Sequence, residues 1–257
     1  MLNKENIILT LQKIGINHND TILIHSSLKS IGPIEGGPQE LINILKEYLY
    51  DGLLIFPTHT WNVMNQDDMQ FDIDNTDSCV GALTNIARKT PGFLRSPHPT
   101  HSVCAYGKNA KWYIEHDLNA TTPVGPNNCF GVLKEINAKM LFIGAPLSKI
   151  TFVHSIEEEF DVKDRFTDKI YHFTTKYNGK IIDYFMPKHY SKYNPHLSEH
   201  YEKLLPIMLD RNIAKQFYFG NANSYIIDTK KCHQLVSKIL TNDIHIFDSF
   251  KPIELID

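Results

Sequence analysis

A histidine stands one helical turn before a run of three carboxylates in the segment from Thr151 to Glu159. On a helix, residues three and four apart share a face, so His154 can meet Glu157 or Glu158 whatever the rest of the fold does. A carboxylate that accepts a hydrogen bond from one imidazole nitrogen fixes the tautomer and leaves the other nitrogen as a base. Amphipathic helices also carry such pairs as structural ion pairs. His154 is therefore a candidate general base, with an ion pair of no catalytic role as the alternative.

A second segment, from Arg95 to Ser102, is rich in polar donors and is stiffened by two prolines. Two further serines, Ser26 and Ser27, follow a short apolar run that is typical of a buried strand. In open α/β sheets, ligands bind beyond the carboxyl ends of strands, which makes these serines candidates for a binding loop. An ordinary turn, in which the hydroxyls satisfy backbone groups, is the simpler interpretation.

Common nucleotide and metal motifs are missing from the sequence. Gly36-Gly37-Pro38 opens an expected helix and could offer N–H groups to an anion, but no Walker sequence and no Gly-x-Gly-x-x-Gly occurs. Among thirteen histidines, His98 and His101 are three apart, yet the prolines around His98 rule out a regular helix there. No His-Glu-x-x-His is found, so we expect no metal. Without a base nearby in sequence, Cys129 is interpreted as a buried, inert thiol.

Composition points to a soluble cytoplasmic protein of enzyme size. The 257 residues are 42% hydrophobic and carry a net charge of −3, which gives no reason to expect nucleic acid as a partner. The N-terminus has no signal-peptide pattern, and no apolar run is long enough to span a membrane. Four widely spaced cysteines suit free thiols in a reducing compartment. With no linker or repeat apparent, we expect one domain over residues 1–257.

The elements that must position these residues alternate between strand and helix for two thirds of the chain. This alternation predicts an α/β fold with a parallel or mixed sheet covered by helices on both faces. The expected strands are 21–25, 53–56, 102–106 and 140–143, and the expected helices are 3–15, 38–48, 81–88, 109–116 and 129–136.

The last third begins with a strong hairpin signal. Asn178-Gly179 separates two strand-like runs, 170–177 and 180–185, and supplies the two positive-φ positions of a type I′ turn. A helix is expected over 197–211, where Pro206 interrupts it or marks a second start. Strands near 217–219 and 224–227 follow, and Asp228 or Thr229 is expected to cap a final helix that ends near residue 240.

Read together and in order, these segments resemble the aminoglycoside 3-N-acetyltransferase family, which includes the YokD-like proteins. The resemblance covers about residues 20 to 240, and it implies a three-layer α/β/α sandwich with a central mixed sheet. The motifs that carry it are Ile24-His25-Ser26-Ser27-Leu28, Gly36-Gly37, Phe56-Pro57-Thr58, Arg95-Ser96-x-His98-Pro99-x-His101-Ser102, His116 with Thr122-Pro123-x-Gly125, Gly144 with Thr151-x-x-His154-x-x-Glu157, and Phe219-Gly220-Asn221-Ala222.

The resemblance implies direct acetyl transfer from acetyl-CoA to a substrate amine, with His154 as the general base. Glu157 is then the expected orienting partner, and Glu158 is the alternate. The expected contacts to CoA come from two segments, Ser26, Ser27 and Leu28 for the pantetheine arm and thioester, and Arg95, Ser96, His98, His101 and Ser102 for the phosphates or the cleft. Asp72 and His116 are expected to contact the amine-bearing substrate.

The acceptor is left open by the sequence. Enzymes for polycationic aminoglycosides should present an acidic cleft, which a net charge of −3 hardly supports. The lysine- and tyrosine-rich segment 186–200 suits a neutral or anionic amino sugar better, for example a nucleotide-linked one. Asn128-Cys129 also stands where the family commonly has Ser-Pro. The alternatives are a metal-dependent hydrolase built on the histidines and a non-catalytic CoA-binding relative, and a homodimer is one option for assembly.

Overall fold

The computed structural model describes residues 1–192 and 194–254 and has a mixed seven-stranded sheet at its centre. The central strand β1 runs parallel to its neighbours β2 and β6, and every other pair of neighbours is antiparallel. In order across the sheet, the strands are β4 (Leu94–Arg95), β5 (Val103–Gly107), β2 (Leu53–Pro57), β1 (Thr21–Ser26), β6 (Lys139–Ile143), β10 (Ala222–Asp228) and β9 (Ala214–Phe219).

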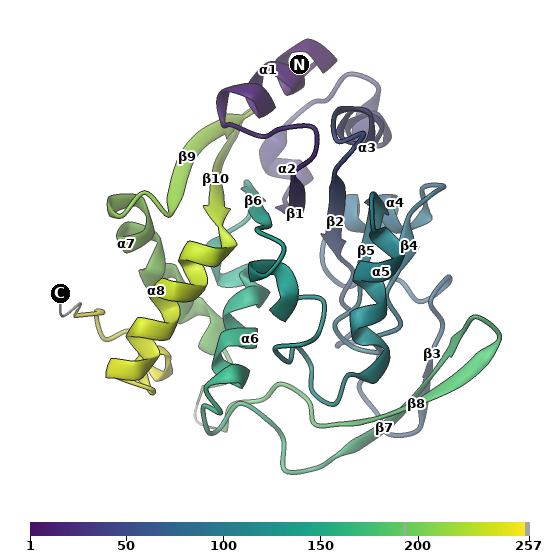
Figure 1. The fold of residues 1–257 in the computed structure, drawn as a ribbon, viewed down its shortest axis with the longest axis vertical. Coiled ribbons are helices and arrows are strands. Elements are labelled where there is room, and N and C mark those ends of the chain that lie inside the picture. Colours follow the sequence, from purple (N-terminus) through teal and green to yellow (C-terminus); the bar gives the residue numbers. More distant parts are fainter. Residues whose placement is uncertain (193, 255–257) are drawn as a thin grey trace.

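Helices cover both faces of this sheet, so the predicted three-layer α/β/α sandwich is confirmed (Figure 1). Side chains alternate along a strand between the two faces, and accordingly Leu23 enters one apolar core while Ile22 and Ile24 enter the other. One core is closed by α1 (Lys4–Lys13), α2 (Leu28–Ile31), α3 (Gly37–Tyr48) and α4 (Ala82–Lys89). The other is closed by α5 (Ala110–Ile114), α6 (Thr151–Glu159), α7 (Leu204–Asp210) and α8 (Thr229–Asn242).

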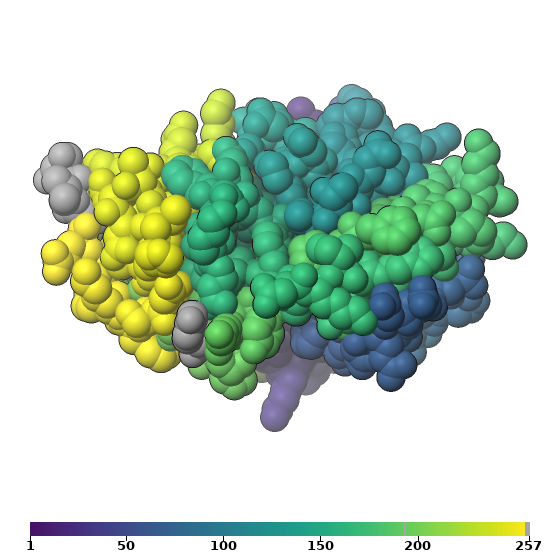
Figure 2. Space-filling view, turned by 90° about the horizontal axis from the view of Figure 1, so that it is seen from below, coloured from purple at the N-terminus to yellow at the C-terminus, as the bar shows by residue number. Residues whose placement is uncertain are grey.

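The predicted hairpin is confirmed and forms a second, smaller sheet. β7 (Tyr171–Tyr177) and β8 (Lys180–Met186) join through Asn178 and Gly179, whose φ angles of 49° and 76° are the positive values that a type I′ turn requires. In Figure 1 the two strands reach below α5, away from the main sheet. β3 (Met69–Phe71) pairs in parallel with β7, and Figure 2 shows the blue segment around β3 against the green hairpin.

Most other predicted boundaries hold with small changes, but the expected helix over 129–136 is only a four-residue 3₁₀ helix. Asp228 caps α8 by accepting a hydrogen bond from the N–H of Lys231 at 2.9 Å. Pro206 does mark a second start, because the expected helix over 197–211 divides into the 3₁₀ helix η4 (Leu197–Lys203) and α7. The remaining 3₁₀ helices are η1 (Glu115–Asn119), η2 (Gly131–Lys134), η3 (Leu147–Lys149) and η5 (Ile246–Asp248). Within the described residues, no helix has the length and apolar character needed to cross a membrane.

Candidate functional site

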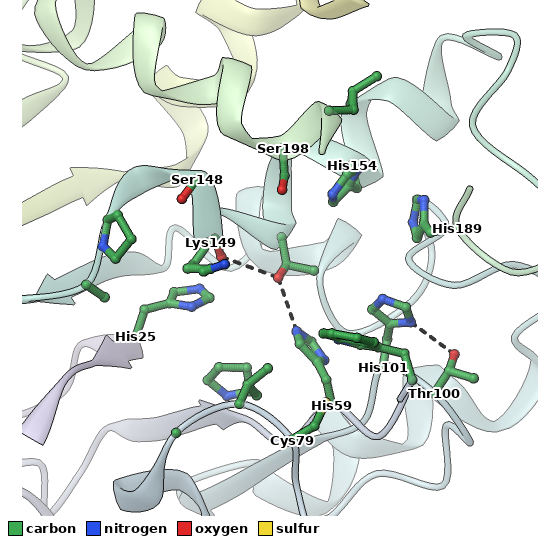
Figure 3. A pocket seen from close by; sticks show the side chains of 18 of the residues that line it. His25, His59, Cys79, Thr100, His101, Ser148, Lys149, His154, His189 and Ser198 are labelled. Atoms are coloured by element: carbon green, nitrogen blue, oxygen red, sulfur yellow. Dashed lines mark hydrogen bonds between the residues drawn. The ribbon is translucent and has the colours of Figure 1, made fainter. Parts of the chain in front are cut away.

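A cavity of about 670 Å³ opens at the carboxyl ends of β1, β2 and β6. These three strands are parallel, so the residues that follow them meet at one edge of the sheet. Five histidines from separate segments face this space, as the close-up in Figure 3 shows: His25, His59, His101, His154 and His189. The lining also includes serines, threonines, Trp61, Cys79, Lys149, Arg165 and, from one long segment, residues 188–191, 194, 195, 197 and 198.

His154 lies on α6 with its side chain 20% exposed, at the wall of the cavity. Its Nδ1 atom is 2.8 Å from the hydroxyl of Tyr201 and 3.3 Å from Oε2 of Glu157. The rings of Tyr201 and His189 pack against the imidazole, with centroids 5.1 and 4.5 Å away. Because Nδ1 faces protein partners, Nε2 is the nitrogen available to the cavity.

Glu157 is fixed by three neighbours and is only 1% exposed. Arg165 Nε donates to Oε1 at 2.8 Å, and Tyr201 donates to Oε2. Burial alone would raise the pKa of this carboxyl, but the adjacent imidazole of His154, the charge of Arg165 and the hydrogen bond from Tyr201 hold the pKa below its ordinary value. Arg165 in turn reaches Asp248 with Nη2 at 2.6 Å. The carboxylate beside His154 is therefore ionised and immobile.

Glu158 does not share this role. Its Oε1 accepts a hydrogen bond from the N–H of Val124 at 3.0 Å. Nε2 of His189 is 3.2 Å from the same oxygen but is not aligned for a hydrogen bond. Of the two carboxylates that the sequence offered to His154, the structure brings Glu157 to its Nδ1 atom, whereas Glu158 bonds to the backbone of Val124.

Burial favours the uncharged form of four cavity histidines, His25, His59, His101 and His154. Burial lowers the pKa of His25 to about 3. Burial also holds the pKa values of His59 and His101 well below the ordinary value, and neighbouring histidines add to the effect. Burial lowers the pKa of His154 and His189 lowers it further, whereas Glu157 acts to raise it. A neutral imidazole at His154 is the form that can accept a proton.

Three of the residues expected to contact CoA do line the cavity. Ser26 and Ser27 lie where β1 ends, and His101 faces His59 with ring centroids 4.9 Å apart. The hydroxyl of Ser27 also caps α2 by accepting from the N–H of Ser30 at 3.3 Å. Leu28 is not part of the lining, because it packs against the apolar core on the α3 side of the sheet.

Arg95 is a correction to the sequence analysis. It is buried, and its guanidinium donates to the backbone oxygens of Ile73, Thr76 and Thr58 at 2.6 to 2.9 Å. Burial lowers its pKa to about 10. The guanidinium thus holds the loop after β3 against the sheet, and Arg95 is not part of the cavity lining.

The rest of this segment supports the cavity from behind. Ser96, His98 and Ser102 are fully buried, and none of them lines the cavity. Their polar atoms form hydrogen bonds inside the protein. Ser96 Oγ accepts from the N–H of Val103, and Ser102 Oγ donates to the carbonyl of Thr58. Nε2 of His98 bonds to the carbonyl of Thr122. The structure thus places these three side chains, like Arg95, outside the lining of the cavity in which contacts to CoA were expected.

The two expected substrate contacts also lie elsewhere. Asp72 closes a turn after β3, where its carboxylate accepts from the N–H groups of Asp74 and Asn75 at 3.0 Å. His116 lies in η1 with its ring edge-on to Trp112, and neither residue belongs to the cavity lining. Both are local structural contacts of a kind that polar residues make in turns and helices.

Sequence reasoning missed several residues of the site. Tyr201 and Arg165 carried no motif, and neither did His59, whose Nε2 is 3.1 Å from the hydroxyl of Thr151. His189 and Lys149 also line the cavity. Among the described residues, no three His, Cys, Asp or Glu side chains are grouped so that they could hold a metal ion.

Comparison with known proteins gives a consistent result. The family model described as aminoglycoside 3-N-acetyltransferase matches residues 23–241. An aminoglycoside N(3)-acetyltransferase III from Salmonella sp is 30% identical over 174 residues, which cover 60% of this chain and 60% of that enzyme. An aminoglycoside N(3)-acetyltransferase VII from Streptomyces paromomycinus is 26% identical over 62% of this chain and 61% of its own length. The chain thus spans about three fifths of the length of these curated relatives.

Solved structures share the fold. The apoenzyme of aminoglycoside acetyltransferase AAC(3)-IVa superposes with a TM-score of 0.80 at 23% identity, over 96% of this chain and 91% of that one. The YokD protein from Bacillus subtilis superposes with a TM-score of 0.77 at 18% identity, over 95% of this chain and 100% of that one. At these identities the similarity concerns the arrangement of helices and strands.

Proposed function

The chain belongs to the aminoglycoside 3-N-acetyltransferase family, and from this premise we propose that it transfers the acetyl group of acetyl-CoA to an amine. The observation that carries the proposal is the setting of His154. Its Nδ1 is held by Tyr201 beside the ionised Glu157, so that Nε2 is left for a cavity at the carboxyl ends of parallel strands. Because Asp248 of η5 also reaches this site through Arg165, we propose that residues 1–257 work as one domain.

The residues of the cavity fit a thioester co-substrate with a phosphorylated tail. Its described lining contains Lys149 and Lys188 and no Asp or Glu, so phosphates meet no repulsion there. Nε2 of the buried His25 has no hydrogen-bond partner among the described residues, which leaves it for an amide of a bound arm. Acetyl-CoA supplies the acetyl group in activated form, and Ser26 and Ser27 are proposed to hold it near His154.

His154 is proposed to act as the general base. The acceptor enters as a free amine, and Nε2 removes one proton from its nitrogen as that nitrogen bonds to the acetyl carbonyl carbon. The carbon–sulfur bond breaks, and the imidazolium returns the proton to the departing sulfur. One amide and one free thiol result, and His154 is neutral again. Glu157 stabilises the imidazolium between the two transfers without taking the proton itself.

The charged groups of the cavity favour an acceptor that is not a polycation. Arg165 is balanced by Glu157 and Asp248, whereas Lys149 and Lys188 have no carboxylate within 4 Å in the described chain. A multiply charged cation would gain no ion pair on entering this space. We therefore propose an amino sugar with neutral or anionic substituents, such as a nucleotide-linked one, with an aminoglycoside as the alternative.

Thiol release and product mass should be measured with kanamycin, UDP-glucosamine and the methyl glycoside of glucosamine as acceptors. We expect kcat/KM for UDP-glucosamine to exceed that for kanamycin by at least about tenfold, the effect of about 1.4 kcal/mol. Lys149→Glu should lower this ratio, because it removes a positive charge that favours the anionic acceptor over the polycation. Any effect of the change on CoA binding is common to both acceptors and does not alter the ratio. Lys108→Glu, an exposed change outside the cavity, should leave it unchanged. Rapid turnover of kanamycin and of no other acceptor would contradict the proposal of a neutral or anionic amino sugar. Binding of CoA without transfer to any amine would indicate a non-catalytic relative.

A further inference from the structure

The hydroxyl of Tyr201 contacts both His154 and Glu157. It is 2.8 Å from Nδ1 of His154, and it donates a hydrogen bond to Oε2 of Glu157. The direct approach of Nδ1 to the same Oε2 is longer, at 3.3 Å. The nearest partner of the imidazole is therefore a neutral hydroxyl, with the carboxylate oxygen beside it.

Counting protons assigns the direction of each hydrogen bond. A tyrosine hydroxyl has one proton to donate, whereas an ionised carboxylate can only accept. The pKa of Glu157 is lowered and burial raises the pKa of Tyr201, so the carboxyl is ionised and the phenol keeps its proton. A charged acceptor makes the stronger hydrogen bond, so the proton of Tyr201 goes to Glu157. Only the oxygen of Tyr201 then remains for His154, and Nδ1 must carry the proton.

The surroundings hold this hydroxyl in place. Tyr201 lies in η4, is fully buried, and packs edge-on against Phe247 with ring centroids 5.1 Å apart. The neighbouring His200 bonds through Nδ1 to the carbonyl of Phe247 at 2.6 Å, which ties η4 to η5. Arg165 fixes the other oxygen of Glu157. The phenol ring cannot turn away without disturbing this packing.

We propose that Tyr201 is a positioning residue that sets the tautomer of His154, with the proton on Nδ1 and Nε2 free toward the cavity. The role matters for catalysis only if the proposed acetyl transfer is correct, since it leaves to Nε2 the lone pair that removes the amine proton.

The test is ¹⁵N NMR of the histidine side chains in the ligand-free protein, for the wild type and for Tyr201→Phe. We expect His154 to be protonated on Nδ1 in the wild type and to shift toward the other tautomer in the variant. The kcat for transfer should fall by about 10- to 100-fold, the usual effect of removing a group that orients a ligating or catalytic histidine, with the KM for acetyl-CoA unchanged. Tyr113→Phe is the matched control, because its hydroxyl is equally buried and bonds to the carbonyl of Cys129.

The outcomes separate this inference from the proposed function. Protonation of His154 on Nε2 in the wild type would overturn the role of Tyr201 and needs no variant to fold. An unchanged tautomer and kcat in Tyr201→Phe would overturn it as well, even with acetyl transfer established. A tautomer that depends on Tyr201 in a protein that acetylates no amine would support the positioning role and overturn the proposed function.

Discussion

Replacing His154 by alanine should reduce acetyl transfer by about two to four orders of magnitude, the usual contribution of a general base. The imidazole is the group at the cavity wall that is held by both a hydroxyl and an ionised carboxylate, and alanine cannot accept a proton. Binding of CoA should persist, because His154 is proposed to contact the amine rather than the phosphates. Steady-state kcat/KM and calorimetric binding of CoA measure the two effects separately.

His116→Ala is the control for this experiment. The side chain lies outside the cavity, against Trp112, and its removal should leave transfer within about twofold, as expected for a residue that takes no part in the site. This control also tests the correction to the sequence analysis. Survival of transfer in His154→Ala, or a loss as large in His116→Ala, would show that the base has been misplaced.

Replacing Arg165 by leucine should lower the free energy of unfolding by about 3–5 kcal/mol, because it leaves the buried charge of Glu157 without its cation. Both side chains are almost fully buried, 2% and 1% exposed, with Nε and Oε1 2.8 Å apart. The double variant Glu157→Leu/Arg165→Leu should lose much less than Arg165→Leu, since no unpaired charge is left inside. Urea denaturation at neutral pH gives all of these values.

The exposed ion pair between Lys4 and Glu47 provides the comparison. Its side chains are 49% and 67% exposed, and Lys4→Leu should change the stability by no more than about 1 kcal/mol. A cost for Arg165→Leu as small as that for Lys4→Leu would mean that Glu157 is solvated or protonated. In that case the carboxylate could not support an imidazolium at His154.

Local patterns were read correctly from the sequence because they depend on neighbours along the chain. The spacing of His154 and Glu157 places them on one helix face, and Asn178-Gly179 supplies the backbone angles of its turn. Alternating strands and helices similarly indicated the layers. The short elements α2, β3 and β4 were missed, since two to four residues are too few to show a periodicity.

The partners of the site could not be predicted in the same way. Tyr201 is 47 residues from His154, and Asp248 is 83 residues from Arg165, so only the tertiary fold brings them together. Arg95 shows the converse error. Its residue type suits a phosphate, but the sequence does not reveal that three backbone carbonyls already occupy its guanidinium. Residue type indicates what a side chain could bind, and only its burial and contacts indicate what it does bind.

The proton transfer by His154 is tested most directly by the ratio of kcat/KM for wild type to that for His154→Ala, measured from pH 8 down to about pH 5. Ionisation of the amine affects both enzymes alike and cancels in this ratio. Since burial lowers the pKa of His154, its base form should persist below the ordinary histidine value of about 6.5. The ratio should therefore stay constant to below that pH and then fall with the uptake of one proton, because an imidazolium cannot act as a base. A ratio that already falls at or above the ordinary histidine pKa of about 6.5, or that is close to one throughout, would contradict the assignment of His154 as the base.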